Sequence, residues 1–382
     1  MSFENEIAQL NEHFFFREFT YSKNTFRPSP TAEVELADNI LWLDDIVVAF
    51  QLKERNLVGA TTAEEESHWF DRKVISRGTK QIRDTLTYLR SHAMIELKNH
   101  RGHKFQLAGS KINTIHKVIC YLANDNLPDE CSARKFHRSK TAGIIHLIQA
   151  KDYLGIVRTL LTPPELSEYL YFREELIGKW DISVNIVPEP ALVGQYLCGN
   201  TNISPSINFL DYLAALEHRI DEWDISGIIK NFPDRVTTDN ESTDYYGIVT
   251  ELAKLKRNEL REFKKRFQLS MDKCRANKFA QPYRFACPRS DCGFVFIPIE
   301  KEFLHHRQQG LQNFTYGCKY DLKRSKCIGV SFAPEEGGWY SVEWCFIEFP
   351  WEFDAELERR LKENNPFREV RTAELERYSY RE

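Results

Sequence analysis

The pattern of apolar and polar residues predicts a β-hairpin in the region 33–55. Two runs rich in β-branched residues, near 36–43 and 46–54, are separated by the polar pair Asp44-Asp45, which is typical of a tight turn between strands. If the turn is centred on this pair, residues that face each other have numbers that sum to 89. The register of the two strands therefore follows from the position of the turn.

This register brings three polar side chains to one end of an apolar strand pair. Asp38 lies opposite Gln51, with Cβ atoms about 5 Å apart. Lys53 lies on the same face as Gln51, because side chains alternate between the two faces of a strand. Polar groups at the end of a buried strand pair carry a desolvation cost, so this cluster favours a functional role over a purely structural one.

The flanking segments predict a sheet covered by helices. The predicted elements are a helix at 3–10, strands at 14–21, 36–43 and 46–54, a helix at 63–91, a turn leading into a strand at 98–107, and strands at 117–122 and 141–148. The second helix follows Thr61-Thr62, with acidic residues three positions on, which is the signature of a capping box. Residues 27–30 are expected to interrupt regular structure because they contain two prolines, and residues 134–140 are expected to form a basic loop. Alternating helices and strands indicate an α/β fold around a mixed sheet.

The rest of the chain predicts two further regions. Residues 161–278 have a mostly helical pattern. Strands at 283–286, 293–299, 327–332 and 339–349, with helical runs at about 300–315 and 353–364, indicate a small α+β domain after them. We therefore expect three domains, at 1–160, 161–278 and 279–382. The last helix of the middle region, expected at 244–277, is rich in basic residues. It is consistent with contact to a phosphate backbone, or with an amphipathic core helix whose basic side chains reach solvent.

Composition and charge narrow the classes of protein. The chain has 382 residues, 42% of them hydrophobic, which excludes a disordered protein. Its formal net charge is −4, so contact with nucleic acid must use local basic patches. The nine cysteines are scattered along the chain, as expected for reduced thiols in the cytoplasm. No apolar run approaches the length of a membrane-spanning helix, so no membrane partner is expected.

The polar cluster of the hairpin has the composition of a magnesium site. Mg²⁺ prefers oxygen ligands, commonly one or two carboxylates completed by carbonyl groups and water. Asp38 offers a carboxylate and Gln51 an amide oxygen, and the ammonium of Lys53 can stabilise negative charge that develops in a transition state. Glu35 near the same strand and Glu6 on the first helix are candidates for further metal-binding carboxylates.

Asp38, twelve further residues and then Gln51-Leu52-Lys53 resemble the active-site signature of the PD-(D/E)XK nuclease superfamily. The resemblance implies a restriction-endonuclease-like fold with an αβββαβ core, and the predicted elements of the first domain follow the same order. It also implies hydrolysis of DNA phosphodiester bonds with Mg²⁺ or Mn²⁺. Asp38 would then be a metal ligand, Gln51 would occupy the (D/E) position, and Lys53 would be the catalytic lysine.

The sequence departs from the family pattern at two points. No proline precedes Asp38, and Gln51 replaces the second acid, as in the QxK variant of Mrr-like restriction enzymes. The site is then one carboxylate short. Glu35 or a glutamate of the first helix, foremost Glu6, would have to supply it.

A basic stripe follows the hairpin. Lys73, Arg77 and Lys80 recur at helical spacing, and the resemblance implies that this helix faces the site, with Lys73 and Gln81 placed to contact phosphate. An ordinary solvated helix face is the alternative interpretation of the stripe. The expected partners are DNA, an operon-encoded protein and a second copy of the chain, in restriction or in defence against foreign DNA. The alternative function is a catalytically inactive nuclease-like module that only binds DNA or protein.

Four cysteines of the C-terminal region form a second candidate site. Cys287, Cys292, Cys318 and Cys327 could hold a structural Zn²⁺ ion in tetrahedral geometry. Neither spacing is the CxxC typical of such sites, and buried cysteine is also common as a small apolar residue. Both interpretations are consistent with the sequence.

Overall fold

The computed structural model describes residues 2–29, 32–55, 61–217, 220–225, 228, 232, 241–278, 280–335, 337 and 340–371. The protein is of the mixed α/β class, as expected. It divides into two compact units, Met1–His218 and Arg219–Glu382, rather than at 160 and 278 as the three-domain prediction had it. The helices between residues 160 and 218 belong to the first unit because they contribute to the cover of one face of its sheet.

A six-stranded mixed sheet forms the centre of the first unit. Its strands are β1 (Thr20–Ser22), β4 (Asn39–Leu43), β5 (Ile46–Glu54), β8 (Thr114–Leu122), β9 (Phe136–Ser139) and β10 (Gly143–Gln149). Their order in the sheet is β1-β4-β5-β8-β10-β9. β1, β4 and β5 are antiparallel neighbours, β5, β8 and β10 run parallel, and β9 pairs antiparallel with β10 at one edge.

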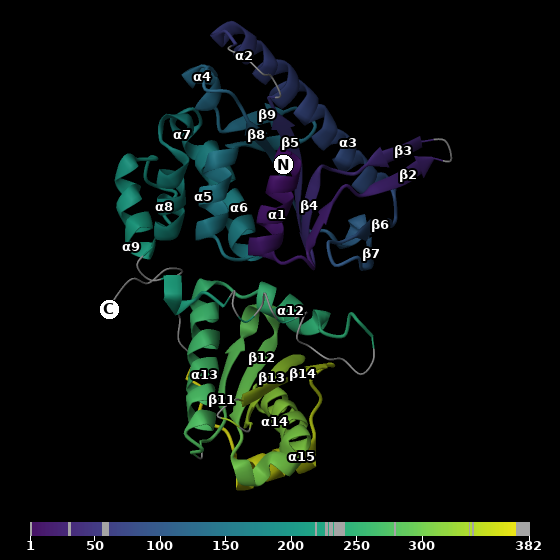
Figure 1. The fold of residues 1–382 in the computed structure, drawn as a ribbon, viewed down its shortest axis with the longest axis vertical. Helices are drawn as coiled ribbons and strands as arrows, with labels where there is room; N and C mark the ends of the chain where they lie inside the picture. Colours follow the sequence, from purple (N-terminus) through teal and green to yellow (C-terminus); the bar gives the residue numbers. More distant parts are fainter. Residues whose placement is uncertain are drawn as a thin grey trace. The chain divides into compact units, whose positions relative to one another are not determined.

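Helices cover both faces of this sheet (Figure 1). On one face lie α1 (Phe3–Phe15), α5 (Ala150–Thr159), α6 (Pro163–Trp180) and α8 (Glu189–Cys198), and on the other lie α2 (Ala63–Trp69), the π-helical turn η1 (Phe70–Arg77) and α3 (Gly78–Ser91). Phe50 of β5 packs on Tyr153 of α5, with ring centroids 5.5 Å apart. Its neighbour Ala49 points the other way and shares a core cluster with Phe70 and Val74. The order α1, β1, β4, β5, α3, β8 runs helix, three strands, helix and strand, but the last strand is β8 and not the strand predicted within 98–107, which lies in a separate two-stranded sheet.

Smaller elements complete the first unit. They are the two-stranded sheets β2 (Thr25–Ser29) with β3 (Ala32–Glu35) and β6 (Ile95–Lys98) with β7 (Lys104–Leu107), and the short helices η2 (Gly109–Lys111), α4 (Asp129–Ser132), α7 (Ser183–Ile186), η3 (Ile207–Phe209) and α9 (Leu210–Glu217).

Several local predictions need correction. The expected strand at 14–21 begins only at Thr20, because Phe15 continues the four-residue spacing of the buried face of α1. Residues 27–29 lie in β2 despite Pro28, since the β2–β3 pair shifts register between Phe26 and Ser29. The basic loop at 134–140 contains the edge strand β9. The helix at 63–91 is continuous and begins with the predicted capping box at Thr62, but its centre is the π-helical turn η1.

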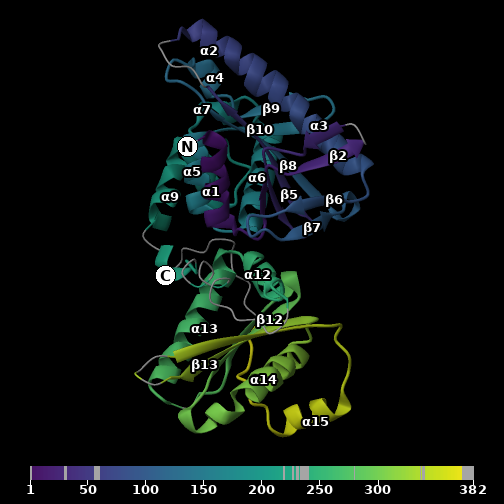
Figure 2. The ribbon, with the colours of Figure 1, turned by 45° about the vertical axis from the view of Figure 1, so that its right-hand side comes forward.

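The second unit has a four-stranded sheet between helices. The strands are β11 (Tyr283–Cys287), β12 (Cys292–Pro298), β13 (Lys326–Pro334) and β14 (Tyr340–Glu348), in that spatial order. The helices are η4 (Ile220–Glu222), α12 (Tyr246–Ala253), α13 (Arg257–Arg275), η5 (Pro288–Ser290), η6 (Lys301–His306), α14 (Arg307–Asp321) and α15 (Ala355–Glu363). Figure 2 shows α13 and α14 on opposite sides of this sheet.

The predicted strands of this unit are confirmed, but the helix expected at 244–277 is two helices. The backbone N–H of Lys256 donates to the Glu259 carboxylate at 2.7 Å, which starts α13 afresh after α12. Phe263 and Phe267 of α13 pack against aromatic residues of the sheet such as Phe296. None of the helices in the described part of the chain is long and apolar enough to cross a membrane.

Candidate functional site

The hairpin of β4 and β5 has the predicted register. Asn39 pairs with Phe50 and Ile40 with Ala49, so the numbers of paired residues sum to 89. The turn is tight because Asp44 adopts a positive φ of 50°, a conformation that aspartate tolerates better than most residues. Asp38, directly before β4, is thereby brought to Gln51 and the residues beyond it.

The carboxylate of Asp38 is bound to the end of β5. Its Oδ2 accepts from the backbone N–H of Leu52 at 2.6 Å and from Nζ of Lys53 at 3.3 Å. Nζ of Lys53 also donates to the carbonyl of Leu52 at 2.8 Å. Burial lowers the pKa of Lys53, and the nearby Asp38 carboxylate only partly opposes this effect. The ammonium is thus held in place, with a weakened preference for the charged form.

Gln51 supplies an oxygen atom that the fold leaves unsatisfied. Its side chain is 2% exposed, and its Oε1 atom has no hydrogen-bond partner among the described residues. A buried acceptor without a partner costs about 1–3 kcal/mol. Such an atom beside the Asp38 carboxylate is the kind of donor that a hard cation recruits, so the residues present fit a Mg²⁺ or Mn²⁺ ion.

Two further carboxylates, those of Glu35 and Glu4, contribute to the electrostatics of the site. Partial burial raises the pKa of Glu35, and the negative charges of Asp38 and Glu4 raise it further. Glu4 therefore is the α1 carboxylate that acts on the site, and its charge also acts on Lys53. Glu6, which the sequence favoured, is not among the main contributors to either shift. The reason is geometric, because residues two apart on an α-helix point about 200° apart.

The helix on the other side of the site is attached to it directly. Oγ1 of Thr85 on α3 donates to the carbonyl of Leu36 at 2.5 Å, which fixes the segment that leads to Asp38. Gln81, one turn earlier, has a buried Oε1 with no partner among the described residues. The charge of Arg77 contributes to the lowered pKa of Lys53, so η1 and α3 lie next to the candidate site.

The predicted basic stripe of Lys73, Arg77 and Lys80 is exposed. Within the described part of the chain, none of the three forms an ion pair. Unpaired bases beside a carboxylate cluster are available to a polyanion. The three residues lie on the continuous helix formed by η1 and α3, and their contact with phosphate stays a prediction.

A cluster that sequence reasoning missed lies on the opposite face of the same sheet. His116 of β8, His146 of β10 and Glu174 of α6 place one ligand atom each within 4.8 Å of one another, an arrangement that could hold a metal ion. We call these three residues the histidine cluster. Within the ranges that the structure covers, it is the one group of three such ligands, so Glu35, Asp38 and a glutamate of α1 do not converge as closely.

Hydrogen bonds engage part of the histidine cluster, because Nε2 of His116 bonds to Oγ of Ser167 at 2.8 Å, whereas the buried Nε2 of His146 has no hydrogen-bond partner among the described residues. Arg173 donates to Nδ1 of His146 at 3.0 Å, so a neutral His146 carries its proton on Nε2, which lies 3.4 Å from Glu174. Burial lowers the pKa of His116 to about 3 and that of His146 to about 4. No pattern in the sequence points to this cluster, because neither the pairing of β8 with β10 nor the position of α6 against them follows from residue spacing.

The four candidate zinc ligands are buried in the second unit. Sγ of Cys287 donates to the Glu259 carboxylate at 3.0 Å, whereas Cys318 and Cys327 belong to the apolar cluster under α14. The four thiols do not bring three ligand atoms within the distance seen in the histidine cluster. Burial raises the pKa of the Cys287 and Cys327 thiols, which opposes the thiolate form that zinc binds.

Comparisons of the chain with protein-family models, with curated proteins and with solved structures found no match. The functional assignment therefore depends on the geometry of the candidate site.

Proposed function

We propose that the protein is a metal-dependent nuclease that hydrolyses phosphodiester bonds of DNA. The observation that carries this proposal is the convergence at the end of β5. The Asp38 carboxylate, the unsatisfied Oε1 of Gln51 and the ammonium of Lys53 lie together there. One carboxylate, one neutral oxygen and one cation are the groups that metal-assisted attack on a phosphodiester requires.

Each residue has a role that follows from its contacts. Asp38 and Gln51 would hold a divalent ion, which when bound lowers the pKa of a water molecule and neutralises charge on the phosphate. Lys53 is fixed by the Leu52 carbonyl and can donate a hydrogen bond to a phosphate oxygen. The raised pKa of Glu35 reflects crowded negative charge, which a bound cation would relieve.

Activity measurements on variants test the proposal. We expect the wild type to cut DNA in Mg²⁺ or Mn²⁺ at low salt, and Asp38→Ala or Lys53→Ala to abolish cutting. Asp125→Ala and Lys151→Ala change exposed residues of the same types and should cut like the wild type. Cutting that persists in the Asp38 and Lys53 variants would refute the site assignment.

The second candidate function is a nuclease-like module that binds without cutting. Its support is that Asp38 already accepts two hydrogen bonds from β5, while Glu35 and Asp38 belong to no group of three converging ligands among the described residues. Binding of duplex DNA without cleavage in either metal, with loss of binding when Lys73, Arg77 and Lys80 are replaced together, would favour this function.

A further inference from the structure

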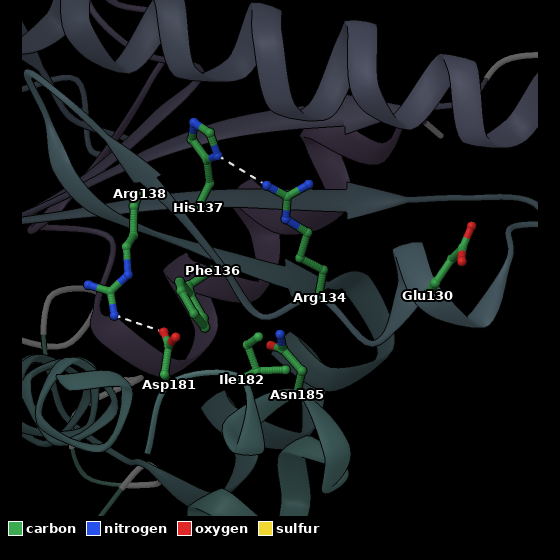
Figure 3. A pocket seen from close by; sticks show the side chains of 8 residues that line it. All are labelled: Glu130, Arg134, Phe136, His137, Arg138, Asp181, Ile182 and Asn185. Carbon is green, nitrogen blue, oxygen red and sulfur yellow. Dashed lines mark hydrogen bonds and ion pairs between the residues drawn. The ribbon is translucent and has the colours of Figure 1, made fainter. Parts of the chain in front are cut away.

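A cavity of about 470 Å³ opens at the free edge of the six-stranded sheet. Its lining comes from β9, from the turn before it and from the segment after α6, all within the first unit. Figure 3 shows Arg134 and His137 on one side of the strand, with Phe136 and Arg138 on the other side facing Asp181. The volume is in the range of small-molecule sites.

Arg134 is the cation of this cavity that lacks an acidic partner. Its guanidinium donates to Nδ1 of His137 at 3.2 Å, and it forms no ion pair with any residue that the structure describes. Burial lowers the pKa of His137, and the charge of Arg134 lowers it further. A neutral His137 accepts from Arg134 and leaves the other N–H groups of the guanidinium for an anion.

The opposite side of the strand offers a flat surface. The guanidinium of Arg138 lies over the ring of Phe136, 5.3 Å from its centroid, and it also forms an exposed ion pair with Asp181 at 3.0 Å. Ile182 beside them is 69% exposed, which is unusual for a large apolar side chain in a cavity. Aromatic rings and guanidinium planes are the surfaces on which nucleic acid bases stack.

The strand edge adds backbone donors. Leu147 N–H donates to the carbonyl of Lys135 at 2.9 Å, and hydrogen-bonded pairs alternate along an antiparallel ladder. The N–H groups of Phe136 and Arg138 therefore point away from β10, toward the free edge. Backbone N–H groups beside a guanidinium make a strong site for a phosphate oxygen.

The cavity wall is held in place by the sheet. The carbonyl of Ser132 accepts from Gln149 at 3.0 Å and from Tyr121 at 3.4 Å, and the N–H of Lys135 donates to the side chain of Asn185 at 2.9 Å. These bonds fix the backbone on both sides of Arg134. The site is therefore built before any ligand arrives.

The cavity lies at the same end of the sheet as the candidate nuclease site. Leu52 pairs with Cys120, and Cys120 pairs with Ile148. The register of β10 with β9, extended by two residues, places Arg134 opposite Ile148. Three strand spacings separate Arg134 from Leu52, which corresponds to about 14 Å.

We propose that this cavity binds a nucleotide, with its phosphate at Arg134 and its base against Phe136 and Arg138. The lining carries two arginines and two acids, Glu130 and Asp181, so the cavity suits a single phosphate rather than a polyphosphate. The nucleotide is either free or part of a nucleic acid strand. Binding needs no metal and does not depend on hydrolysis at Asp38.

Calorimetric titration of the full chain in EDTA tests this proposal with dAMP, dATP, adenosine and inorganic phosphate as probes. We expect dAMP to bind at least about tenfold more tightly than adenosine or phosphate, since each probe lacks one half of the contacts. dATP should bind no more tightly than dAMP. Displacement of dAMP by a single-stranded oligodeoxynucleotide identifies the ligand as part of a strand, and failure to displace it identifies a free nucleotide.

Variants locate the binding. Arg134→Gln should weaken dAMP binding about tenfold or more by removing a charge-assisted hydrogen bond, and Ile182→Glu should do the same at a position that is 69% exposed. Arg158→Gln, at an exposed arginine of α5, should bind like the wild type. Unchanged dAMP affinity in both cavity variants, or inorganic phosphate binding as tightly as dAMP, would overturn the proposal. Because EDTA prevents metal-dependent cleavage, the dAMP titration tests nucleotide binding independently of the proposed nuclease activity.

Discussion

Replacement of Gln51 by methionine tests whether the candidate site lowers the stability of the metal-free protein in order to bind a metal ion. Methionine has a similar shape and no hydrogen-bonding carbonyl, so Gln51→Met removes the unsatisfied Oε1 from a side chain that is 2% exposed. A buried acceptor without a partner costs about 1–3 kcal/mol. We expect the metal-free variant to be more stable than the wild type by an amount in this range.

Gln51→Met should also remove the stabilisation of the protein by a divalent metal ion. A ligand at a hundredfold excess over its Kd stabilises the folded state by about 2.7 kcal/mol. We expect Mg²⁺ or Mn²⁺ to stabilise the wild type in this way and to leave Gln51→Met almost unchanged. Thermal unfolding measures both effects, because 1 kcal/mol shifts Tm by about 2–4 °C in a chain of 150–250 residues.

A matched control isolates the role of the metal. Ser331 of β13 is also buried with an Oγ atom that has no partner among the described residues, but it lies in the second unit. Ser331→Ala should remove a similar cost without altering the metal response. A lower Tm of metal-free Gln51→Met, or equal metal stabilisation of the variant and the wild type, would show that Gln51 is a structural residue and not a ligand.

Three further predictions concern the surroundings of the site. Thr85→Val breaks the hydrogen bond to the Leu36 carbonyl. It should lower the free energy of unfolding in urea by about 1–2 kcal/mol and weaken Mn²⁺ binding, whereas Thr85→Ser should behave like the wild type. Full Mn²⁺ affinity in Thr85→Val would contradict the link between this hydrogen bond and the site. Gly78→Ala would place its Cβ 2.7 Å from Cδ1 of Ile119 and should lower the free energy of unfolding by about 1–3 kcal/mol. Ile119→Val should remove this destabilisation, since valine lacks the Cδ1 atom. An equal destabilisation by Gly78→Ala in the Ile119→Val background would refute the clash. The two histidines of the histidine cluster have folded pKa values of about 3 and about 4, below 6.5, so below pH 6.5 the unfolded chain binds protons that the folded chain does not. Stability should therefore fall from pH 6.5 to about 4, by up to about 2.7 kcal/mol per pH unit, and His146→Gln should reduce this slope in urea titrations; an equal slope in the variant would contradict the assignment.

The parts of the fold that could be predicted are those with local signals. The register of β4 and β5 follows from one turn, and the start of α2 follows from the capping box at Thr62. The edge strand β9 had no such signal because its residues, Phe136–Ser139, are mostly polar and basic. Its strand conformation depends on pairing with β10, which is a tertiary contact.

The predicted domain boundary near residue 161 differs from the division seen in the structure for a related reason. Composition changes near residue 161, where Pro163 and Pro164 start α6, and this change predicted a boundary. The sheet nevertheless needs a cover on the face that carries Phe50, and the helices after the boundary contribute to it. Arg173 of α6 reaches His146 of β10, so the change in composition marks a change of layer within one unit.

The candidate site shows the same limit. The alternation of a single strand was enough to place Gln51 and Lys53 on one face, and the turn placed Asp38 beside them. Glu4 could not be distinguished from Glu6, because the sequence does not tell which side of α1 faces the hairpin. The cavity at Arg134 joins β9 to the segment after α6, and no pattern in either segment points to the other.

The negative charge around residue 51 explains why a glutamine, and not a glutamate, is favourable at this position. Asp38, Glu35 and Glu4 already crowd negative charge near Lys53, and this crowding contributes to the raised pKa of Glu35. A glutamate at position 51 would bury one more negative charge in the metal-free protein, and burial of a charge costs more than burial of an amide. In the proposed metal site, glutamine would supply a ligand oxygen without that charge. Such a site would attract a divalent ion less strongly than one with a second acid, but it would bury less charge when the ion is absent.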